Sequence, residues 1–412
     1  MNLLFLDAYY EPETIAYTHL ENDLIVELIA DGHIVHVICP TPTRGVTDEE
    51  RQKYQRKKIE KKYDNRLIIN RFWAPKEKKN PLLRACRYFW CNIRTYQRAI
   101  RQNDIDVVFS NSTPPTQGLL GGTVAQKLSK RYGKKIRFVY NLQDIFPDSL
   151  VSTGLARIGS LLWKIGRKIE DATYKKADEI ILISQGFKNN LVAKRVPEEK
   201  INVISNWIDL STVYPIDRKE NRLIKEFGID PGKFLVVYAG NFGAAQGADI
   251  VLKLAKELEE YKDIQFVIFG GGAYFEDAKK KSENLDNIII KGLMPQERVS
   301  EVYSLGDVAL ITCKKGLGKA GLPSKTWSIM AANTPIIASF DMDSDLADII
   351  KNADAGQCVQ AEDVFELKNA ILLFYNNTKP GIKKVKLRDF VEKNASKEKC
   401  VDRYVKSITL SK

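Results

Sequence analysis

The sequence has few of the residues that bind metals or form disulfide frameworks. It contains three histidines, His19, His33 and His36, and six cysteines, none of which forms a CxxC pair. Structural zinc sites take four Cys or His ligands at close spacing, so we expect no such site. Without paired cysteines, the thiols are predicted to be reduced and mostly buried, as in a cytoplasmic protein.

Long hydrophobic runs are also absent. The longest, such as Phe234–Gly240 and Val308–Cys313, are far shorter than the roughly 20 residues that span a bilayer. The opening MNLLFLDAYYEPE lacks the basic start of a secretory signal, and we interpret it as a first strand. With 44% hydrophobic and 28% charged residues, the composition is that of a globular protein, which excludes a wholly disordered or coiled-coil chain.

Three common motifs of nucleotide-binding proteins and hydrolases are missing. No GxGxxG follows the first strand, where the sequence reads Asp7–Glu13, and no GxxxxGK[ST] or GxSxG occurs. The sequence therefore gives no support to a dinucleotide-binding fold, to P-loop chemistry or to an α/β-hydrolase.

The positive charge is concentrated in one segment. Arg44–Arg101 contains 18 Lys and Arg against 6 Asp and Glu, an excess of 12 that equals the net charge of the chain. A local basic region predicts one docking face for an anionic partner, such as nucleic acid, phosphate groups or an anionic membrane. The alternative interpretation is a solvated basic surface without a partner.

Strand-like and helix-like segments alternate in two series. The first series of strands comprises Asn2–Tyr9, Ile34–Cys39, Leu67–Phe72, Val107–Ser110, Ile136–Asn141 and Glu179–Ile183, and the second comprises Phe234–Ala239, Ile264–Phe269, Ile288–Lys291, Val308–Thr312 and Pro335–Ser339. Such alternation predicts two doubly wound α/β domains with parallel sheets. We place the first domain at residues 1–205 and the second at 206–389, and expect a terminal helix at about 390–412 to pack back on the first.

Glycine-rich loops follow several strands of the second series. Ligands of open α/β sheets bind at the carboxyl ends of the strands, where glycines and helix N-termini bring backbone N–H groups close to an anion. These loops are Gly240–Gly243, Gly270–Gly272, Gly292–Pro295 and Lys314–Lys325. The last contains four lysines and predicts an anion cradle, with a flexible surface loop as the alternative.

Ordered motifs along nearly the whole chain resemble one known family. They are Tyr9-Tyr10-Glu11-Pro12-Glu13, Ser112-Thr113-Pro114-Pro115, Asp144-Ile145-Phe146-Pro147-Asp148, Asn206-Trp207-Ile208-Asp209, Gly240-Asn241-Phe242-Gly243 with Gln246-Gly247, and Gly318–Lys325. In this order and spacing they resemble glycosyltransferase family 4, and within it a WbuB/WcaI-like subgroup that builds bacterial surface polysaccharides.

The resemblance implies a GT-B fold, in which two Rossmann-like domains with parallel sheets face across a cleft. It implies a retaining transferase that moves a sugar from a nucleotide-sugar, by expectation UDP-linked, to a hydroxyl of a glycan or polyprenyl-diphosphate-linked acceptor, without a cofactor. The residues carried over are Asp144, Asp148 and Lys325 as catalytic; Asn241, Phe242, Gly243, Gln246, Leu293, Met294, Lys319, Gly321, Leu322, Pro323, Ser324, Lys325 and Ser328 as donor-binding; and Tyr10, Glu11, Glu13, His19 and Ser112 as acceptor-binding.

The sequence departs from the family pattern at several positions. The family's glutamate pair falls at Ala320 and Ser328, neither of which is acidic. Its Arg and Lys for the donor diphosphate fall near Asn241–Phe242 and at Gln246, and its catalytic-site histidine falls near Asn111–Ser112. Lys325 or Lys319 is expected to compensate, because two phosphates buried without a cation are costly.

One pattern suggests a metal ion. Asp341-Met342-Asp343 matches the Asp-x-Asp with which other glycosyltransferases hold a divalent cation. It precedes a segment that contains Asp345 and Asp348. Capping of a helix N-terminus explains these carboxylates at least as well as a metal ion does. We therefore expect activity that does not depend on a metal.

The basic segment contains an amphipathic helical pattern. Phe89, Trp90 and Tyr96 interleave with five arginines, namely Arg84, Arg87, Arg94, Arg98 and Arg101. Such a helix is typical of an interfacial membrane contact, and Leu155–Lys176 has a similar pattern. We expect peripheral binding at the inner face of the cell membrane; packing of both helices on the sheet is the alternative.

Two other functions remain open at this stage. One is a GT-B sugar-nucleotide epimerase, which would act without an acceptor. The other is a nucleic-acid-binding protein, suggested only by the pI of about 9.1. The chain lacks a helix-turn-helix signal and aromatic–basic sheet motifs, so we expect no nucleic acid partner.

Overall fold

The computed structural model describes residues 1–13, 17–78, 80–152, 154, 156–381 and 386–410, and its contacts divide the chain into two compact units. The first unit comprises Met1–Ser205 and Cys400–Lys412, and the second comprises Asn206–Lys399. The return of the chain to the first unit thus begins at Cys400 rather than at about residue 390. Val391 and Ala395 lie in the hydrophobic core of the second unit, which explains the difference.

The first unit is built on an eight-stranded sheet with the order β3-β4-β2-β1-β5-β6-β7-β8. All neighbours pair in parallel except β3, which is antiparallel to β4. The strands are β1 (Asn2–Leu6), β2 (Ile34–Pro40), β3 (Ile59–Lys62), β4 (Leu67–Phe72), β5 (Val107–Asn111), β6 (Arg137–Leu142), β7 (Glu179–Leu182) and β8 (Ile201–Val203).

The helices of this unit are α1 (Thr18–Ala30), α2 (Asp48–Arg56), α3 (Pro81–Ala99), α4 (Gln117–Tyr132), α5 (Asp148–Ser152), α6 (Leu161–Lys176) and α7 (Gln185–Ala193), together with most of α16 (Lys397–Thr409). The central strands are buried along their length, as parallel strands covered on both faces are.

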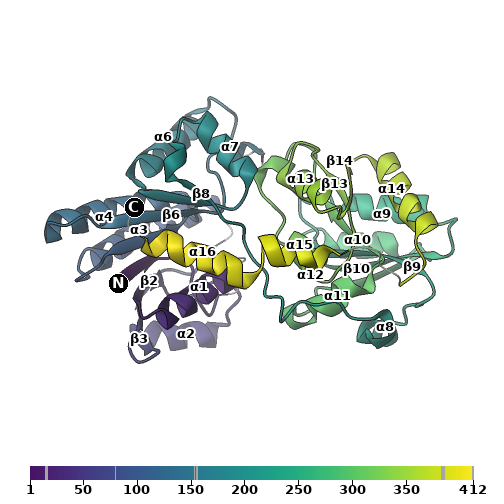
Figure 1. The fold of residues 1–412 in the computed structure, drawn as a ribbon, viewed down its shortest axis with the longest axis horizontal. Helices are drawn as coiled ribbons and strands as arrows, with labels where there is room; N and C mark the ends of the chain where they lie inside the picture. Colours follow the sequence, from purple (N-terminus) through teal and green to yellow (C-terminus); the bar gives the residue numbers. More distant parts are fainter. Residues whose placement is uncertain (14–16, 79, 153, 155, 382–385, 411–412) are drawn as a thin grey trace. The chain divides into compact units, whose positions relative to one another are not determined.

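Helix α16, yellow in Figure 1, lies against the first sheet although it comes last in the chain. The hydroxyl of Tyr404 donates to Asn141 Oδ1 at 3.1 Å, and Ser407 donates to the carboxylate of Glu179. Arg137 donates to the carbonyl oxygen of Ile408 at 3.0 Å. The C-terminal segment therefore completes the first unit.

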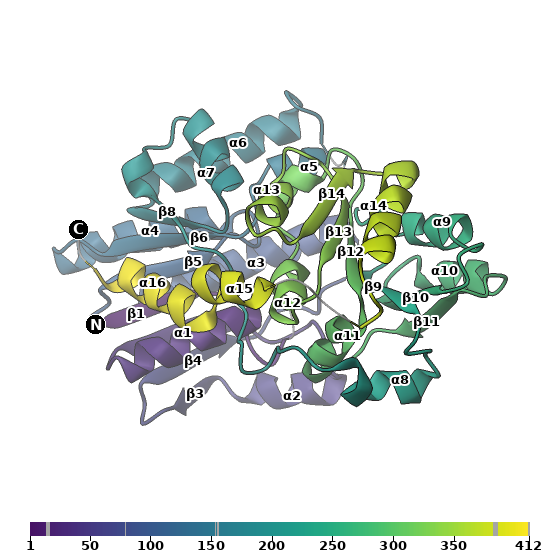
Figure 2. The same cartoon turned by 45° about the vertical axis from the view of Figure 1, so that its right-hand side comes forward.

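The second unit has a six-stranded, fully parallel sheet with the order β11-β10-β9-β12-β13-β14. Its strands are β9 (Phe234–Asn241), β10 (Ile264–Gly271), β11 (Ile288–Gly292), β12 (Val308–Thr312), β13 (Ile336–Phe340) and β14 (Gly356–Gln360). Its helices are α8 (Arg222–Phe227), α9 (Asp249–Glu257), α10 (Phe275–Ser282), α11 (Val299–Leu305), α12 (Lys325–Ala331), α13 (Asp345–Asn352), α14 (Val364–Asn377) and α15 (Leu387–Asn394). Figure 2 shows α14 along β13 and β14, which it contacts.

Both units therefore have the doubly wound architecture that the alternating pattern predicts. Within the described residues, no helix is both long enough and apolar enough to cross a membrane.

Candidate active site

Lys325 supplies a cation at the carboxyl edge of the second sheet. It is the first residue of α12, and its Nζ donates to the carbonyl oxygen of Ala239 at 3.1 Å and lies 4.5 Å from the ring centroid of Tyr238. Burial lowers the pKa of the Lys325 ammonium to about 8. No carboxylate among the described residues pairs with it, so its charge is not neutralised by an ion pair in the part of the chain that the structure describes.

Two glycines allow polar groups to approach the backbone here. A Cβ on Gly240 would stand 3.1 Å from Lys325 Nζ. Gly272 has φ +104°, and a Cβ there would stand 1.8 Å from Asn241 Oδ1. Any larger residue at Gly272 would both strain the backbone and displace Asn241.

The loop after β9 places amides where the family resemblance implies cations. Asn241 is exposed and Gln246 is partly exposed, and both crowd Gly243, whose Cβ would lie 2.7 Å from Asn241 Nδ2 and 2.6 Å from Gln246 Oε1. Phe242 differs, because its side chain is buried in edge-to-face contact with Tyr238 and Phe275. Phe242 therefore anchors the loop through its buried side chain.

The remaining donor residues expected from the sequence are spread over two loops and α12. Lys319 is paired with Asp343. Leu322 and Met294 pack against the core, whereas Leu293 and Ser324 are exposed. Ser328 is one turn after Lys325 and hence on the same side of α12. Gly321 and Pro323 are partly buried in the loop before α12; the side chain of Ala320 lies outside the described residues.

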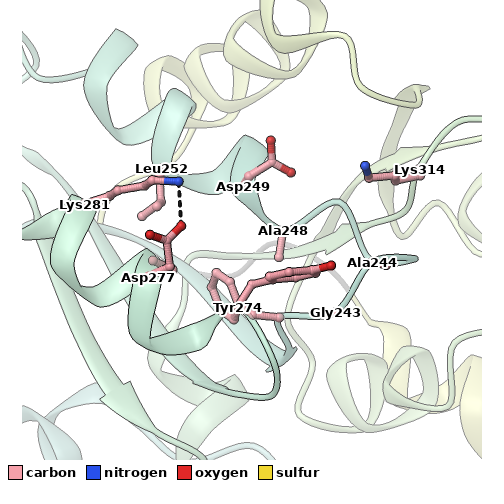
Figure 3. Close-up of a pocket in the computed structure, with 11 residues that line it drawn as sticks. Gly243, Ala244, Ala248, Asp249, Leu252, Tyr274, Asp277, Lys281 and Lys314 are labelled. Carbon is pink, nitrogen blue, oxygen red and sulfur yellow. Dashed lines mark ion pairs between the residues drawn. The ribbon is translucent and has the colours of Figure 1, made fainter.

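A pocket of about 330 Å³ lies beside this edge, between α9 and α10 (Figure 3). Of the expected donor residues, only Phe242 and Gly243 line it. Figure 3 shows Tyr274 beside Gly243, and Lys281 paired with Asp277. Sequence reasoning did not single out Tyr274, whose only signal was its position after the Gly270–Gly272 turn.

Asp341 has a structural role that differs from helix capping. Its Oδ1 accepts the backbone N–H of Gly316 at 2.9 Å, and its Oδ2 accepts that of Gly318 at 2.8 Å. The N-cap of α13 is instead Ser344. The described residues contain no group of three or more His, Cys, Asp or Glu side chains placed to hold a metal ion. The Asp-x-Asp carboxylates thus hold the lysine-rich loop, Asp341 through its amides and Asp343 through Lys319.

Two buried carboxylates meet at the carboxyl edge of the first sheet. Asp7 follows β1 and Glu21 lies on α1, and they are only 1% and 5% exposed. Asn111 Nδ2 donates to both, and its Oδ1 accepts Asn141 Nδ2 at 2.7 Å. Burial is the main cause that raises the pKa of Asp7 to about 6 and the pKa of Glu21 well above its usual value.

Sequence reasoning missed this buried network. Asp7 Oδ2 and Glu21 Oε1 have no hydrogen-bond partner among the described residues. The available signals were an Asp directly after the first strand and a Glu within the apolar face of α1, beside Leu20, Leu24 and Ile25. Asn111 belongs to the segment near which the family resemblance places a histidine.

The expected catalytic carboxylates Asp144 and Asp148 have different surroundings. Asp148 Oδ2 accepts Lys194 Nζ at 2.7 Å and Asn190 Nδ2 at 2.9 Å, so it is held within the fold. No described cation pairs with Asp144, and burial raises its pKa. The Oγ of Ser112 accepts the N–H groups of Gln143 and Asp144 at 3.0 and 3.2 Å. Ser112 therefore fixes the loop that carries Asp144.

The other expected acceptor residues follow β1 or lie on α1. Tyr10 is buried, and Glu11 pairs with Lys62 at 2.8 Å. The Oε1 of buried Glu13 accepts the N–H groups of Thr43 and Arg44 at 2.7 and 2.9 Å. His19 is exposed. Of these four, Tyr10 and Glu13 contribute mainly to packing and loop structure.

The carboxylate of Glu77 pairs with several arginines of the basic segment. It accepts Arg44 in a two-point contact at 2.8 and 3.0 Å, lies 3.1 Å from Arg84 Nε, and accepts the hydroxyl of Tyr9 at 2.8 Å. Arg87 NH1 is 3.9 Å from the same carboxylate, and its side chain is only 1% exposed. The expectation that Arg87 lies on the basic face of the helix is wrong, because α3 packs its Arg87 side toward Tyr9 and Pro75.

The amphipathic face of α3 is nevertheless exposed. Leu82 and Phe89 are 72% and 70% exposed, and Trp90 and Ile93 are also exposed. Exposed apolar side chains also occur at the start of α6, at Ile158, Leu161, Leu162 and Ile165. Large exposed apolar patches bordered by cations mark interaction surfaces. Lys79 and Leu155, which belong to these basic and amphipathic patterns, lie outside the described residues.

Two family models match the chain. Residues 22–212 match Glycosyltransferase Family 4, and residues 219–398 match Glycosyl transferases group 1. The chain is 27% identical over 294 residues to a probable glycosyltransferase, WbjE, of Pseudomonas aeruginosa, covering 69% of this chain and 70% of that protein.

Two further relatives carry more specific names. Alpha-galactosylglucosyldiacylglycerol synthase of Streptococcus pneumoniae is 28% identical over 279 residues, covering 65% of this chain and 68% of that protein. The putative colanic acid biosynthesis glycosyl transferase WcaI of Escherichia coli is 24% identical over 282 residues, covering 66% and 67%.

Solved structures share the fold over the full length. Sucrose-phosphate synthase from Thermosynechococcus elongatus has a TM-score of 0.72 at 15% identity, covering 98% of this chain and 97% of that one. HepE from Anabaena, solved in complex with UDP-glucose, has a TM-score of 0.68 at 14% identity, covering 99% of each chain. These likenesses show the GT-B fold.

Proposed function

Because the chain is a glycosyltransferase of the GT-B fold with a Family 4 domain and a group 1 domain, we propose that it transfers a sugar from a UDP-sugar with retention of the anomeric configuration. The acceptor is a hydroxyl of a glycan or of a polyprenyl-diphosphate-linked sugar, and the product enters a bacterial surface polysaccharide. The naming of WcaI as a putative glycosyl transferase of colanic acid biosynthesis and the UDP-glucose bound to HepE support this assignment.

The observation that carries the proposal is the ammonium of Lys325, which lies among glycine-rich turns and forms no ion pair with any carboxylate of the described residues. Breaking the bond between the sugar and the diphosphate places negative charge on the leaving group. A fixed cation in a poorly solvated site stabilises that charge as it develops. Lys325 thus takes the role of the family's missing Arg and Lys, and the amides of Asn241 and Gln246 supply neutral hydrogen bonds.

On the acceptor side, Asp144 is the carboxylate assigned to the substrate. It is free of ion pairs within the described residues, whereas Asp148 is held by Lys194 and positions the loop. Attack of the acceptor hydroxyl on the same face that the diphosphate leaves retains the configuration and needs no metal ion or cofactor.

We also assign the protein to the inner face of the cell membrane as a peripheral protein. The exposed apolar faces of α3 and α6 and the basic excess of Arg44–Arg101 support this assignment. One relative, by its name a synthase of a glycosylated diacylglycerol, also supports this assignment.

A panel of nucleotide-sugars tests the function. The ligand that binds the native state raises the melting temperature, and Lys325→Ala is expected to abolish this rise, while the matched variant Lys253→Ala, an exposed lysine on α9, keeps it. The anomeric configuration of the product, read by NMR, tests retention. Epimerisation of the donor without any acceptor, or no response to any nucleotide-sugar, would contradict the proposal.

A further inference from the structure

Two cavities in the first unit lie on either side of Trp73, which lines both. The first has a volume of about 270 Å³, and we name it the cationic pocket, because its lining includes Lys58, Arg71, Arg94 and Arg98 but no carboxylate. The second has a volume of about 430 Å³, and we name it the apolar groove. Its lining consists of Trp73, Pro75, Leu83, Cys86 and Trp90, together with Lys76, Lys78 and Arg87.

The charge of the cationic pocket is only partly balanced by the described residues. Arg71 is neutralised by Glu60 at 2.8 Å. Among the described residues, no carboxylate pairs with Lys58, Arg94 or Arg98. Arg98 Nε is buried without a hydrogen-bond partner, and burial together with the neighbouring Arg94 and Arg101 lowers the pKa of Arg98. Like charges gathered around a hollow favour an anionic ligand.

The apolar groove is lined by two aromatic rings and lies beside the cationic pocket. Trp73 and Trp90 meet edge to face with their centroids 6.4 Å apart, and Trp90 Nε1 donates to the carbonyl oxygen of Trp73 at 3.4 Å. The guanidinium of Arg94 lies 5.8 Å from the Trp90 ring. A ligand that spans both cavities therefore has a charged end and an apolar end.

We propose that the cationic pocket and the apolar groove together hold one anionic phospholipid of the membrane. Its phosphate contacts Lys58, Arg94 and Arg98, and one acyl chain passes Trp73 into the groove. Guanidinium groups suit this role, because they bind phosphate oxygens in two-point contacts. This inference rests on the proposed membrane docking and narrows it from a general charge attraction to a site for a single lipid.

The test uses the full chain and a soluble lipid, dihexanoyl phosphatidylglycerol, below the concentration at which it forms micelles. Isothermal titration calorimetry is expected to give saturable binding of one lipid per chain. The double variant Arg94→Gln and Arg98→Gln should weaken lipid binding at least tenfold. If this double variant fails to fold, Arg94→Gln alone is measured, and it should weaken lipid binding by a smaller factor. Arg101→Gln, on the same helix end but outside the lining, should leave it unchanged.

A second pair of variants separates the groove from the exposed surface. Trp73→Ala should weaken lipid binding without changing the affinity for inorganic phosphate. Phe89→Ala, which lines neither cavity, should leave the affinity for the soluble lipid unchanged and lower partitioning to phosphatidylglycerol vesicles.

Three outcomes would overturn the inference. They are the absence of saturable binding, equal affinity for inorganic phosphate and for the lipid, and equal affinity for dihexanoyl phosphatidylcholine. UDP binding, measured on the same variants, is expected to be unchanged. If the wild-type chain binds the lipid but does not bind UDP, the proposed function is rejected while the inferred lipid site is retained.

Discussion

Asp7 and Glu21 share the amide of Asn111, whose Nδ2 is 3.2 Å from Asp7 Oδ1 and 3.2 Å from Glu21 Oε2. A single amide thus joins two carboxylates that are almost fully removed from water. Burial disfavours the charged form of both carboxyl groups, and the charge of Asp7 further raises the pKa of Glu21, so the protonated forms are favoured.

The contribution of this pair to the stability of the protein should therefore fall as the pH rises from about 4 to above 6. The pKa of Asp7 is raised to about 6, so in this interval the folded state binds more protons than the unfolded state, and deprotonation favours unfolding. At pH 8, Asp7→Asn should raise the free energy of unfolding by on the order of 1–3 kcal/mol, since each pKa unit corresponds to about 1.4 kcal/mol.

Urea denaturation at pH 5, 6.5 and 8 measures this effect. Asp171→Asn, which changes a mainly exposed carboxylate on α6, serves as the control and should keep the wild-type pH dependence. If the free energy of unfolding of the Asp7→Asn variant depends on pH in the same way as that of the wild type, the pair titrates as it does in the unfolded chain.

Donor affinity should decrease as the pH rises through about 8. Only the protonated form of Lys325 attracts the diphosphate, and burial lowers the pKa of this ammonium to about 8. Above that pH the UDP affinity should fall by up to about tenfold per pH unit, while Lys325→Ala should bind weakly with a flat profile. Calorimetric titration of UDP between pH 7 and 9.5 measures this dependence. If the affinities of the wild type and of Lys325→Ala change in parallel with pH, Lys325 does not contact the diphosphate.

Asp341 and Asp343 should respond differently to substitution. Asp341→Ala removes the acceptor of two backbone N–H groups in the lysine-rich loop and should weaken donor binding. Asp343→Ala removes only an exposed ion pair and should change the free energy of unfolding by less than about 1 kcal/mol. EDTA should leave transfer unchanged. Activity lost in both variants and on chelation, and restored by Mg²⁺ or Mn²⁺, would instead indicate a metal site.

Glu77 should be important for stability. Glu77→Gln leaves the buried guanidinium of Arg87 without its nearest carboxylate and also breaks the contacts to Arg44 and Arg84. We expect the free energy of unfolding to decrease by about 3 kcal/mol. Glu11→Gln, which breaks the more exposed pair with Lys62, should cost less than about 1 kcal/mol. Equal effects in chemical denaturation would show that burial does not strengthen the Glu77 cluster.

The alternating pattern of the sequence was sufficient to predict the two sheets, because buried parallel strands are continuous apolar runs. It did not predict β3, β8 and β14, which lie at the edges of the sheets. The sequence of β3 is Ile-Glu-Lys-Lys, and three of its residues are exposed. Edge strands of this kind carry no apolar run, and their pairing depends on a neighbour that is distant in sequence.

The candidate site was predictable to a similar degree. The loops that follow the strands lie at the carboxyl edge of the second sheet, as the alternating pattern predicts, because their position depends only on the direction of the chain. The contacts that assign roles are long-range and were not predictable. Asn111 is 104 residues from Asp7, and Lys194 is 46 residues from Asp148. The burial of Arg87 likewise depends on Tyr9, which comes from another part of the sheet.

The position of α16 has a consequence for how the chain folds during synthesis. Domains emerge from the ribosome in sequence order, and N-terminal domains usually fold first. Here the first unit lacks the hydrogen bonds from Tyr404 to Asn141 and from Ser407 to Glu179 until α16 has been made. The second unit, being continuous in sequence, can complete its core earlier. The discontinuous first unit is therefore completed after the second, and a chain truncated before α16 would have one complete unit and one incomplete one.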